Sequence, residues 1–177
     1  EADALETDVT ALAPEPRRIV ANLPYNIATP LLLGWLRQIG SFEGLTLMFQ
    51  KEVAERLAAK PGNKSYGRLS VITQWLAEVR HEFNVSNEAF TPPPKVASSV
   101  VSLIPRAEPL APADWETLEK VTARAFGQRR KMLRQSLKGV PGAVDALEVI
   151  GVNPQRRAET VTVDEFVTLA RVLSAER

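Results

Sequence analysis

The sequence contains no cysteine and only one histidine, His81, among its 177 residues. The lack of cysteine excludes disulfides, thiolate zinc sites and a cysteine nucleophile, and a single imidazole argues against histidine-rich metal sites and a Ser-His-Asp hydrolase. There is also no apolar run of about 18 residues, the length that a membrane-spanning helix needs. No basic-then-apolar leader is present, because the chain starts with the acidic segment EADALETD. We therefore expect a cytoplasmic protein without a metal or a membrane partner.

The remaining composition is that of a soluble globular protein, with 45% hydrophobic and 24% charged residues. Its length suits one large core or two small domains. The net charge is only +1, but the charges are unevenly distributed. Between residues 120 and 138 there are bases and no acid, namely Lys120, Arg124, Arg129, Arg130, Lys131, Arg134 and Lys138. The near-neutral total therefore conceals a basic segment that suits an anionic partner.

The first part of the chain alternates between strand and helix patterns. RIVANL (18–23) and LTLMFQ (45–50) have the apolar character of short buried strands. TPLLLGWLRQI (29–39), between them, has the length and apolar spacing of a helix that opens with Thr-Pro. Strand, helix and strand in this order predict a parallel α/β sheet.

The pattern continues with two helices and two strands. KEVAERLAAK (51–60) and GRLSVITQWLAEV (67–79) are predicted as helices. HEFNVS (81–86) and KVASSVVSLIP (95–105) are predicted as strands on either side of the loop NEAFTPPP (87–94). Three consecutive prolines cannot donate to a ladder and hold an extended conformation, so we expect this loop to be stiff.

The proline-rich segment RAEPLAPA (106–113) has no apolar periodicity and predicts a linker. It would join an α/β domain over residues 1–105 to an all-α domain over residues 114–177. Every pattern after the linker is helical.

Three helices are predicted after the linker. Asp114 can cap the first, which carries a regular apolar face. Gly127 is expected to end it, before a second and basic helix that runs to about Lys138. The last helix opens at Thr162 with Glu165 three residues later, which is the pattern of a capping box.

The segment NLPY follows the first strand directly and is the strongest candidate for chemistry. Asn22 stands at the end of that strand, and ligands of open α/β sheets bind outside the carboxyl ends of the strands. An aromatic amine that attacks an electrophile develops positive charge on its nitrogen, and two oxygen atoms that accept its N–H groups stabilise this charge. The Asn22 Oδ1 atom can be one, and the carbonyl of Leu23 or Pro24 the other. Tyr25 offers a face on which a purine can stack. The alternative is a plain strand-ending turn, which Asn and Pro also favour.

A second aromatic residue, Phe90, precedes the three prolines, and Lys95 follows them. Stiff prolines can fix Phe90 as the opposite wall of a base pocket, with Lys95 close by for a phosphate. The alternative is a hydrophobic plug in front of an edge strand. Together with NLPY, this loop predicts a slot for a flat base, which has to leave its stack to enter.

The basic segment RAFGQRRKMLRQSLK predicts phosphate binding. Arg129, Arg130 and Lys131 are consecutive, and Arg130 and Arg134 are four apart, on one face of the predicted helix. The alternative is a solvated helix end, but the helix dipole explains one or two bases and not seven. The basic surface is expected to extend to Lys51, Lys64 and Arg68.

Five segments, in order and at matching spacing, resemble the bacterial small-subunit ribosomal RNA adenine dimethyltransferases. They are NLPYNIATPLL, QKEVAERL, YGRLSV, FTPPPKVASSVV and AFGQRRKMLRQSL. The resemblance implies a Rossmann-like class I methyltransferase domain followed by a small all-α, RNA-binding domain. It implies S-adenosylmethionine as methyl donor and N6,N6-dimethyladenosine as product, at two adjacent adenosines near the 3′ end of small-subunit rRNA. The implied partner is the assembling small subunit, and we expect a monomer.

The same resemblance assigns roles to individual residues. It implies that the segment from Asn22 to Tyr25 holds the target amine and that Phe90 stacks on the base. It also implies that Asp3 and Ala4 meet the adenine of the donor and that Asn22 borders it.

One part of the family's pattern is missing. No glycine-rich turn precedes Arg18, although such a turn normally lets the backbone approach a nucleotide. We therefore expect an α/β domain that is incomplete at its N-terminus, and a chain that by itself binds S-adenosylmethionine poorly and lacks activity.

Two other functions stay open. A large-subunit rRNA methyltransferase of the erythromycin-resistance type would keep the chemistry and change the substrate. The three prolines and the QRRK segment favour the small-subunit branch. A non-catalytic rRNA-binding assembly factor would agree with the missing donor loop, and donor binding by the full-length protein distinguishes it from an enzyme.

Overall fold

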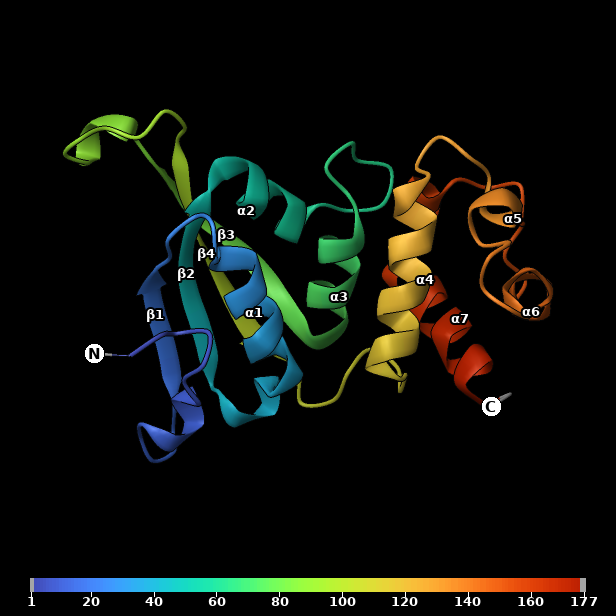
Figure 1. Cartoon of the computed structure of the whole chain (residues 1–177), viewed down its shortest axis with the longest axis horizontal. Helices are drawn as coiled ribbons and strands as arrows, with labels where there is room; N and C mark the ends of the chain where they lie inside the picture. Colours follow the sequence, from blue (N-terminus) through green and yellow to red (C-terminus); the bar gives the residue numbers. More distant parts are fainter. Residues whose placement is uncertain (1, 176–177) are drawn as a thin grey trace. The chain divides into compact units, whose positions relative to one another are not determined.

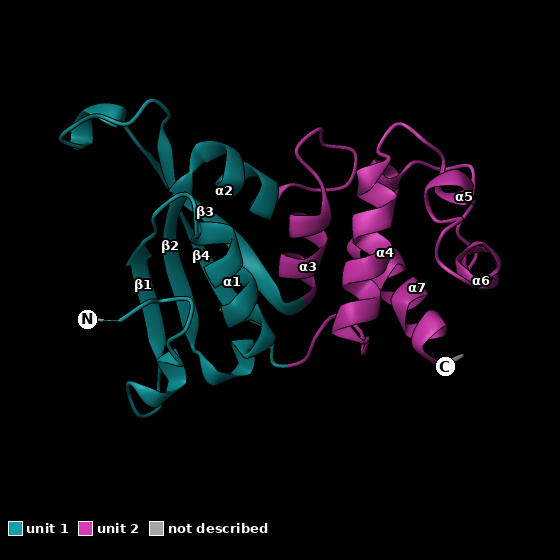
Figure 2. Cartoon of the chain, viewed as in Figure 1, with its two compact units in different colours: residues 1–58, 76–107 teal, residues 59–75, 108–177 magenta. Residues whose placement is uncertain are grey.

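The computed structural model describes residues 2–175 (Figure 1). They group into two compact units (Figure 2). The sheet unit comprises residues 1–58 and 76–107, and the helical unit comprises residues 59–75 and 108–177. No helix of the described residues has the length and apolarity to cross a membrane.

The sheet unit is built on four strands in the order β1-β2-β4-β3. β1 (Arg18–Asn22) and β2 (Gly44–Gln50) pair in parallel, as the strand-helix-strand pattern predicts. β4 (Ser98–Pro105) pairs antiparallel with β2 and with β3 (Ala77–Val85). The sheet is therefore mixed, with a Rossmann-like parallel part and an antiparallel hairpin at one edge.

Two helices cover one face of this sheet. α1 (Ala28–Arg37) connects β1 to β2, and α2 (Lys51–Ala58) follows β2; both lie in front of the sheet in Figure 1. Alternate residues of β2 are buried, as expected for a strand covered on one face. The buried positions are Leu45, Leu47 and Phe49. This burial anchors β2, and β1, which ends at the NLPY loop, pairs with it along its length.

The predicted helix over residues 67–79 is wrong at its end. α3 (Arg68–Leu76) stops at Leu76, and Ala77 to Val79 already belong to β3. These three residues pair with Pro105 to Leu103 of β4. Long-range ladder hydrogen bonds thus override the helical spacing of the apolar residues.

α3 belongs to the helical unit, although the sequence places it in the domain over residues 1–105. The Trp75 indole Nε1 donates to the Ala111 carbonyl at 2.9 Å. The ring of Trp75 also lies 6.1 Å from that of Trp115. The two compact units are defined by contacts between residues and not by independent folding. The predicted domain limits, 1–105 and 114–177 with a linker over 106–113, therefore stay a prediction.

The other helices of the helical unit are α4 (Trp115–Gly127), α5 (Leu133–Ser136), α6 (Ala143–Val149) and α7 (Val163–Ala175). Asp114 caps α4 as predicted, because its Oδ2 accepts from the Thr117 N–H at 2.8 Å. α4 ends at Gly127, also as predicted. The basic helix predicted to Lys138 is wrong, because residues 128–132 form a turn and only the single-turn α5 follows.

The capping box of α7 is confirmed. The Thr162 Oγ1 atom accepts from the Glu165 N–H at 3.1 Å, and Glu165 Oε2 accepts from the Thr162 N–H at 2.7 Å. Arg156 adds two charge-assisted bonds to the Glu165 carboxylate, at 2.6 and 3.1 Å. Burial raises the pKa of Glu165, but the bonds from Arg156 and Thr162 outweigh it and hold this pKa below its ordinary value of 4.5.

This lowered pKa predicts an acid-dependent loss of stability. A carboxyl group whose pKa is lower in the folded state than in the unfolded state stabilises the fold. The stabilisation is complete at a pH above the unfolded-state pKa, and it is lost as the pH falls through the folded-state pKa. We expect Glu165→Gln to melt at a lower temperature than the native chain near neutral pH, and the difference to narrow below pH 4.5. Thermal melts followed by circular dichroism measure this. A difference that does not change with pH would contradict it.

Candidate active site

The NLPY loop starts at the carboxyl end of β1. Asn22 is the last residue of β1 and pairs with Met48 of β2. Its side chain is exposed, and its carboxamide makes no hydrogen bond to any residue in the described range 2–175. Leu23, the next residue, is buried and anchors the loop. A fixed backbone with an unengaged amide is an arrangement that suits ligand recognition.

The Pro24 carbonyl is already engaged. It accepts the Ile27 N–H at 3.1 Å, in the turn that leads into α1. A carbonyl oxygen has two lone pairs, so Pro24 keeps one, but this turn fixes its direction. Of the two carbonyls that the sequence offers as second acceptor, we therefore favour that of Leu23.

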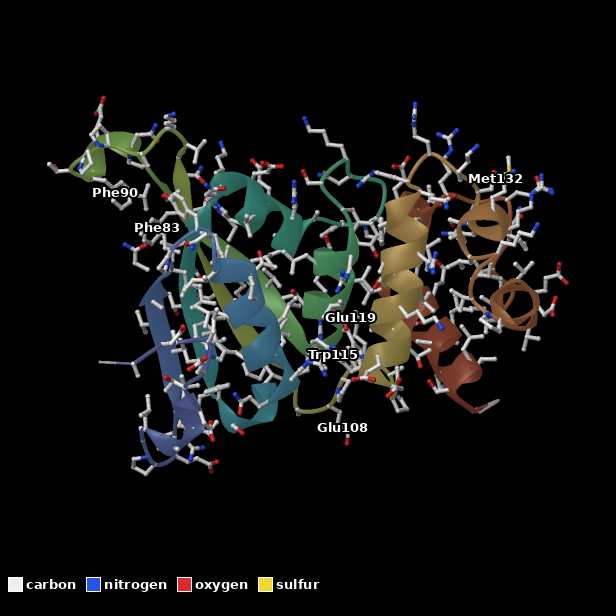
Figure 3. The ribbon with its side chains drawn as sticks, viewed as in Figure 1. Phe83, Phe90, Glu108, Trp115, Glu119 and Met132 are labelled. Carbon is white, nitrogen blue, oxygen red and sulfur yellow. The ribbon has the colours of Figure 1, made fainter. Side chains whose placement is uncertain are left out.

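Asn22, Tyr25 and Phe90 line one cleft of about 310 Å³. The remaining lining residues are Leu23, Pro24, Pro92 and Pro94. Phe90 lies in the loop between β3 and β4 (Figure 3), 65 positions after Tyr25 in the sequence. A cleft of this size is at the lower end of small-molecule sites, which suits one base rather than a larger ligand. The structure thus brings together the two aromatic loops that the sequence singles out.

The Tyr25 ring has both an exposed part and a fixed end. Tyr25 is 38% exposed as a residue, while its hydroxyl lies 2.8 Å from the Oγ atom of the buried Ser98. An aromatic ring whose hydroxyl is held in this way stays at the cleft, because the bond opposes a change of χ1.

The predicted donor-binding residues form only an edge of a site. Asp3 and Ala4 lie on an exposed turn, where the Asp3 carboxylate accepts the Leu5 N–H at 2.8 Å. Asp3 and Asn22 offer polar atoms of the kind that suit an adenosyl group, but two exposed side chains do not enclose one. The described residues therefore do not by themselves fit S-adenosylmethionine. Within residues 2–175, no three His, Asp or Glu side chains gather as a metal site would require.

Arg129 makes internal bonds. Its Nε donates to Glu159 Oε2 at 3.0 Å, and its two terminal nitrogens donate to the carbonyls of Tyr66 and Asn63 at 2.7 and 3.2 Å. These bonds tie the segment before α3 to the basic segment. Its contact with phosphate stays a prediction, but these bonds already give the guanidinium a structural role.

Three other predicted bases are better placed for a phosphate. Arg130, Lys131 and Arg134 are exposed and make no ion pair with any carboxylate in the described part of the chain. The sequence interpretation puts Arg130 and Arg134 on one helical face, which is wrong because Arg130 lies in the turn before α5. Met132, between them, is also exposed (Figure 3).

Arg157 is a candidate that the sequence interpretation misses. An isolated antiparallel bridge joins Met132 to Arg157, and Leu133 N donates to the Arg156 carbonyl at 2.8 Å. The exposed Arg157 therefore lies beside residues 130–134, which carry Arg130, Lys131 and Arg134 and which we call the basic turn. The only signal in the sequence is the pair of arginines in NPQRRA, and spacing alone cannot reveal this pairing.

Of the four predicted bases that remain, Lys64 is exposed in the helical unit, and the other three are spread over both units. Arg68 forms an ion pair with Glu119 in the helical unit. Lys51 and Lys95 are exposed in the sheet unit, and Lys95 does not line the cleft near Phe90. A role of these four in RNA binding stays a prediction.

Comparison with known proteins identifies the family. The sequence model of the family described as ribosomal RNA adenine dimethylase matches residues 1–175. The chain belongs to this ribosomal RNA adenine dimethylase family. The identification agrees with the resemblance that the five sequence segments show.

Two curated relatives carry the name ribosomal RNA small subunit methyltransferase A. That of Rhodospirillum rubrum is 62% identical over 175 residues, which cover 99% of this chain and 61% of the relative. That of Paramagnetospirillum magneticum is 66% identical over 174 residues, which cover 98% of this chain and 62% of the relative. The chain thus spans about three-fifths of the length of these dimethylases.

Two solved structures confirm the class I methyltransferase fold. A dimethyladenosine transferase from Plasmodium falciparum superposes with a TM-score of 0.85 at 27% identity, over 99% of this chain and 72% of that one. The 23S rRNA methyltransferase ErmE superposes with a TM-score of 0.67, also at 27% identity, over 98% of this chain and 70% of that one.

Proposed function

We propose that this chain forms the target-binding part of an S-adenosylmethionine-dependent enzyme that converts two adjacent adenosines near the 3′ end of small-subunit rRNA to N6,N6-dimethyladenosine. The observation that carries the proposal is the single cleft lined by Asn22, Tyr25 and Phe90. Membership of the dimethylase family and the names of its curated relatives support it. The partner is the assembling small subunit in the cytoplasm, and the protein acts as a monomer.

The cleft would act on a base that has left its stack. Tyr25 and Phe90 would hold the two faces of the adenine, because aromatic side chains recognise unstacked bases in this way. The exposed carboxamide of Asn22 would accept one N–H of the exocyclic amine, and the Leu23 carbonyl would accept the other. Both acceptors orient the nitrogen and make its lone pair available outside the ring plane.

The charge that develops on this nitrogen explains why amide oxygens are needed. As the nitrogen forms its new bond it becomes tetrahedral and positive, and oxygens that are already in place stabilise that charge. S-adenosylmethionine would supply the methyl group from its electrophilic sulfonium, and the donor would leave as a neutral thioether. The surplus N–H proton can leave to water afterwards, so the cleft needs no strong base.

The basic turn would hold the RNA by its backbone. Arg130, Lys131, Arg134 and Arg157 are exposed on paired segments of the helical unit. Phosphate contacts of this kind position a nucleic acid without reading its sequence. Selection of the two adenosines would then depend on the shape of the rRNA and on the cleft.

A chimeric enzyme tests the proposal. The matching segment of the Rhodospirillum rubrum relative is replaced by this chain, and unmodified small and large ribosomal subunits are offered as substrates. We expect N6,N6-dimethyladenosine in the small-subunit rRNA alone, detected by mass spectrometry of nuclease digests. Modification of the large subunit would favour the erythromycin-resistance type, and a folded chimera that binds small subunits without methylating them would favour an assembly factor.

A further inference from the structure

Ser98 connects the two loops that form the cleft. It is the first residue of β4 and is fully buried. Its Oγ atom lies 2.8 Å from the Tyr25 hydroxyl, across 73 positions of sequence. It also ends the loop that carries Phe90, because only residues 91–97 separate the two.

The position of Ser98 is itself fixed by the sheet. Ser98 pairs with Gln50 of β2 on one side and with Val85 of β3 on the other. The preceding residue, Ala97, accepts the Lys51 N–H at 2.9 Å, where α2 begins. The bond to Ser98 therefore ties the Tyr25 ring to the centre of the sheet and not to its own loop alone.

An exposed tyrosine without such a bond would be freer to change rotamer. Tyr25 is 38% exposed, so packing alone holds it only in part. A hydrogen bond to this buried hydroxyl fixes the far end of the ring and so restricts χ1, because the oxygen moves when χ1 changes; it does not move when the ring rotates about χ2. The position of the ring decides whether a flat base fits between it and Phe90.

We infer that Ser98 is a positioning residue, whose hydroxyl fixes the position of the Tyr25 ring and thereby the width of the cleft for an unstacked purine. This inference rests on the proposed function, because it assumes that a base enters the cleft. Ser98 touches neither the base nor the methyl donor and acts only through Tyr25.

The neighbouring Ser99 provides a matched control. Ser99 is equally buried and lies in the same strand, but its hydroxyl donates to Asn84 Oδ1 at 2.7 Å instead of to the cleft. Ser99→Ala therefore removes one buried hydroxyl from β4 and leaves Tyr25 anchored. A general weakening of the strand would affect both variants alike.

The test uses the 177-residue chain and a short single-stranded RNA that carries one 2-aminopurine. Fluorescence anisotropy measures RNA binding, and quenching of the 2-aminopurine measures stacking of the base. We expect Ser98→Ala to weaken stacking about 3- to 10-fold while the anisotropy titration stays unchanged, since one hydrogen bond contributes about that factor. Tyr25→Phe should give a similar loss, and Ser99→Ala none. Equal stacking in Ser98→Ala and the native chain would overturn the inference, as would an equal loss in Ser99→Ala.

Thermal melts of Ser98→Ala, Tyr25→Phe and the double variant test the anchor without RNA. If the two hydroxyls act as one bond, the double variant loses no more stability than the more damaging single variant. Additive losses would overturn the inference. A native chain that binds the RNA without quenching the probe would instead contradict the proposed function, and the melts would still decide whether Ser98 anchors Tyr25.

Discussion

Asn22→Ala is expected to slow methyl transfer by the chimeric enzyme about 100- to 1,000-fold, while RNA affinity stays close to normal. The factor is that measured when one preorganised oxygen or N–H group is removed from a charge-stabilising site. The Asn22 side chain makes no hydrogen bond within residues 2–175, so its removal leaves no buried group unpaired. Single-turnover transfer of a radiolabelled methyl group gives the rate, and filter binding gives the affinity.

Asn26→Ala is the control for this prediction. Asn26 is exposed in the same loop, four positions after Asn22, and does not line the cleft. Its replacement should leave both the rate and the affinity unchanged. Equal losses of rate and RNA affinity in Asn22→Ala would mean that Asn22 supports the loop instead of the reaction.

Replacing Arg130, Lys131 and Arg134 together with glutamine should reduce the salt dependence of RNA binding. Each phosphate contact that is lost lowers the slope of log affinity against log salt by about 0.7–0.9, so three contacts lower it by roughly 2–3. Affinity should fall strongly at low salt and little at high salt. Titrations at several potassium chloride concentrations measure the slope. An unchanged slope would mean that the basic turn makes no contact with RNA phosphates.

Arg129→Gln distinguishes phosphate contact from structural support. The Arg129 guanidinium already bonds Glu159 and the carbonyls of Tyr66 and Asn63. Its loss should therefore lower the melting temperature by several degrees and leave the salt slope unchanged. The opposite result, a lower slope without loss of stability, would return Arg129 to the RNA-binding set that the sequence predicts.

Features that depend on neighbouring residues could be predicted from the sequence. Asp114 and the Thr162–Glu165 pair act within one turn of their helices, so their patterns are complete in the sequence. The cleft could also be predicted, because a strand end and a stiff proline loop each restrict where their aromatic residue lies. What the sequence predicts for Tyr25 and Phe90 as neighbours is confirmed; their action on a base stays a prediction.

Features that depend on distant pairing could not be predicted. The spacing of the apolar residues around Ala77 does not indicate that Ala77 pairs with β4 as part of a strand. The turn over residues 128–132 has helix-forming residues, but the bonds of Arg129 and the bridge from Met132 to Arg157 hold it in another conformation. Ser98 was also missed, since only the folded sheet brings its hydroxyl to Tyr25.

The most direct test of the account is an experimental structure of this chain with a short RNA that contains a flipped adenosine. We expect the adenine between Tyr25 and Phe90, with its exocyclic nitrogen about 2.7–3.2 Å from Asn22 Oδ1. An adenine bound elsewhere, or held in the cleft with its amine turned away from Asn22, would contradict it.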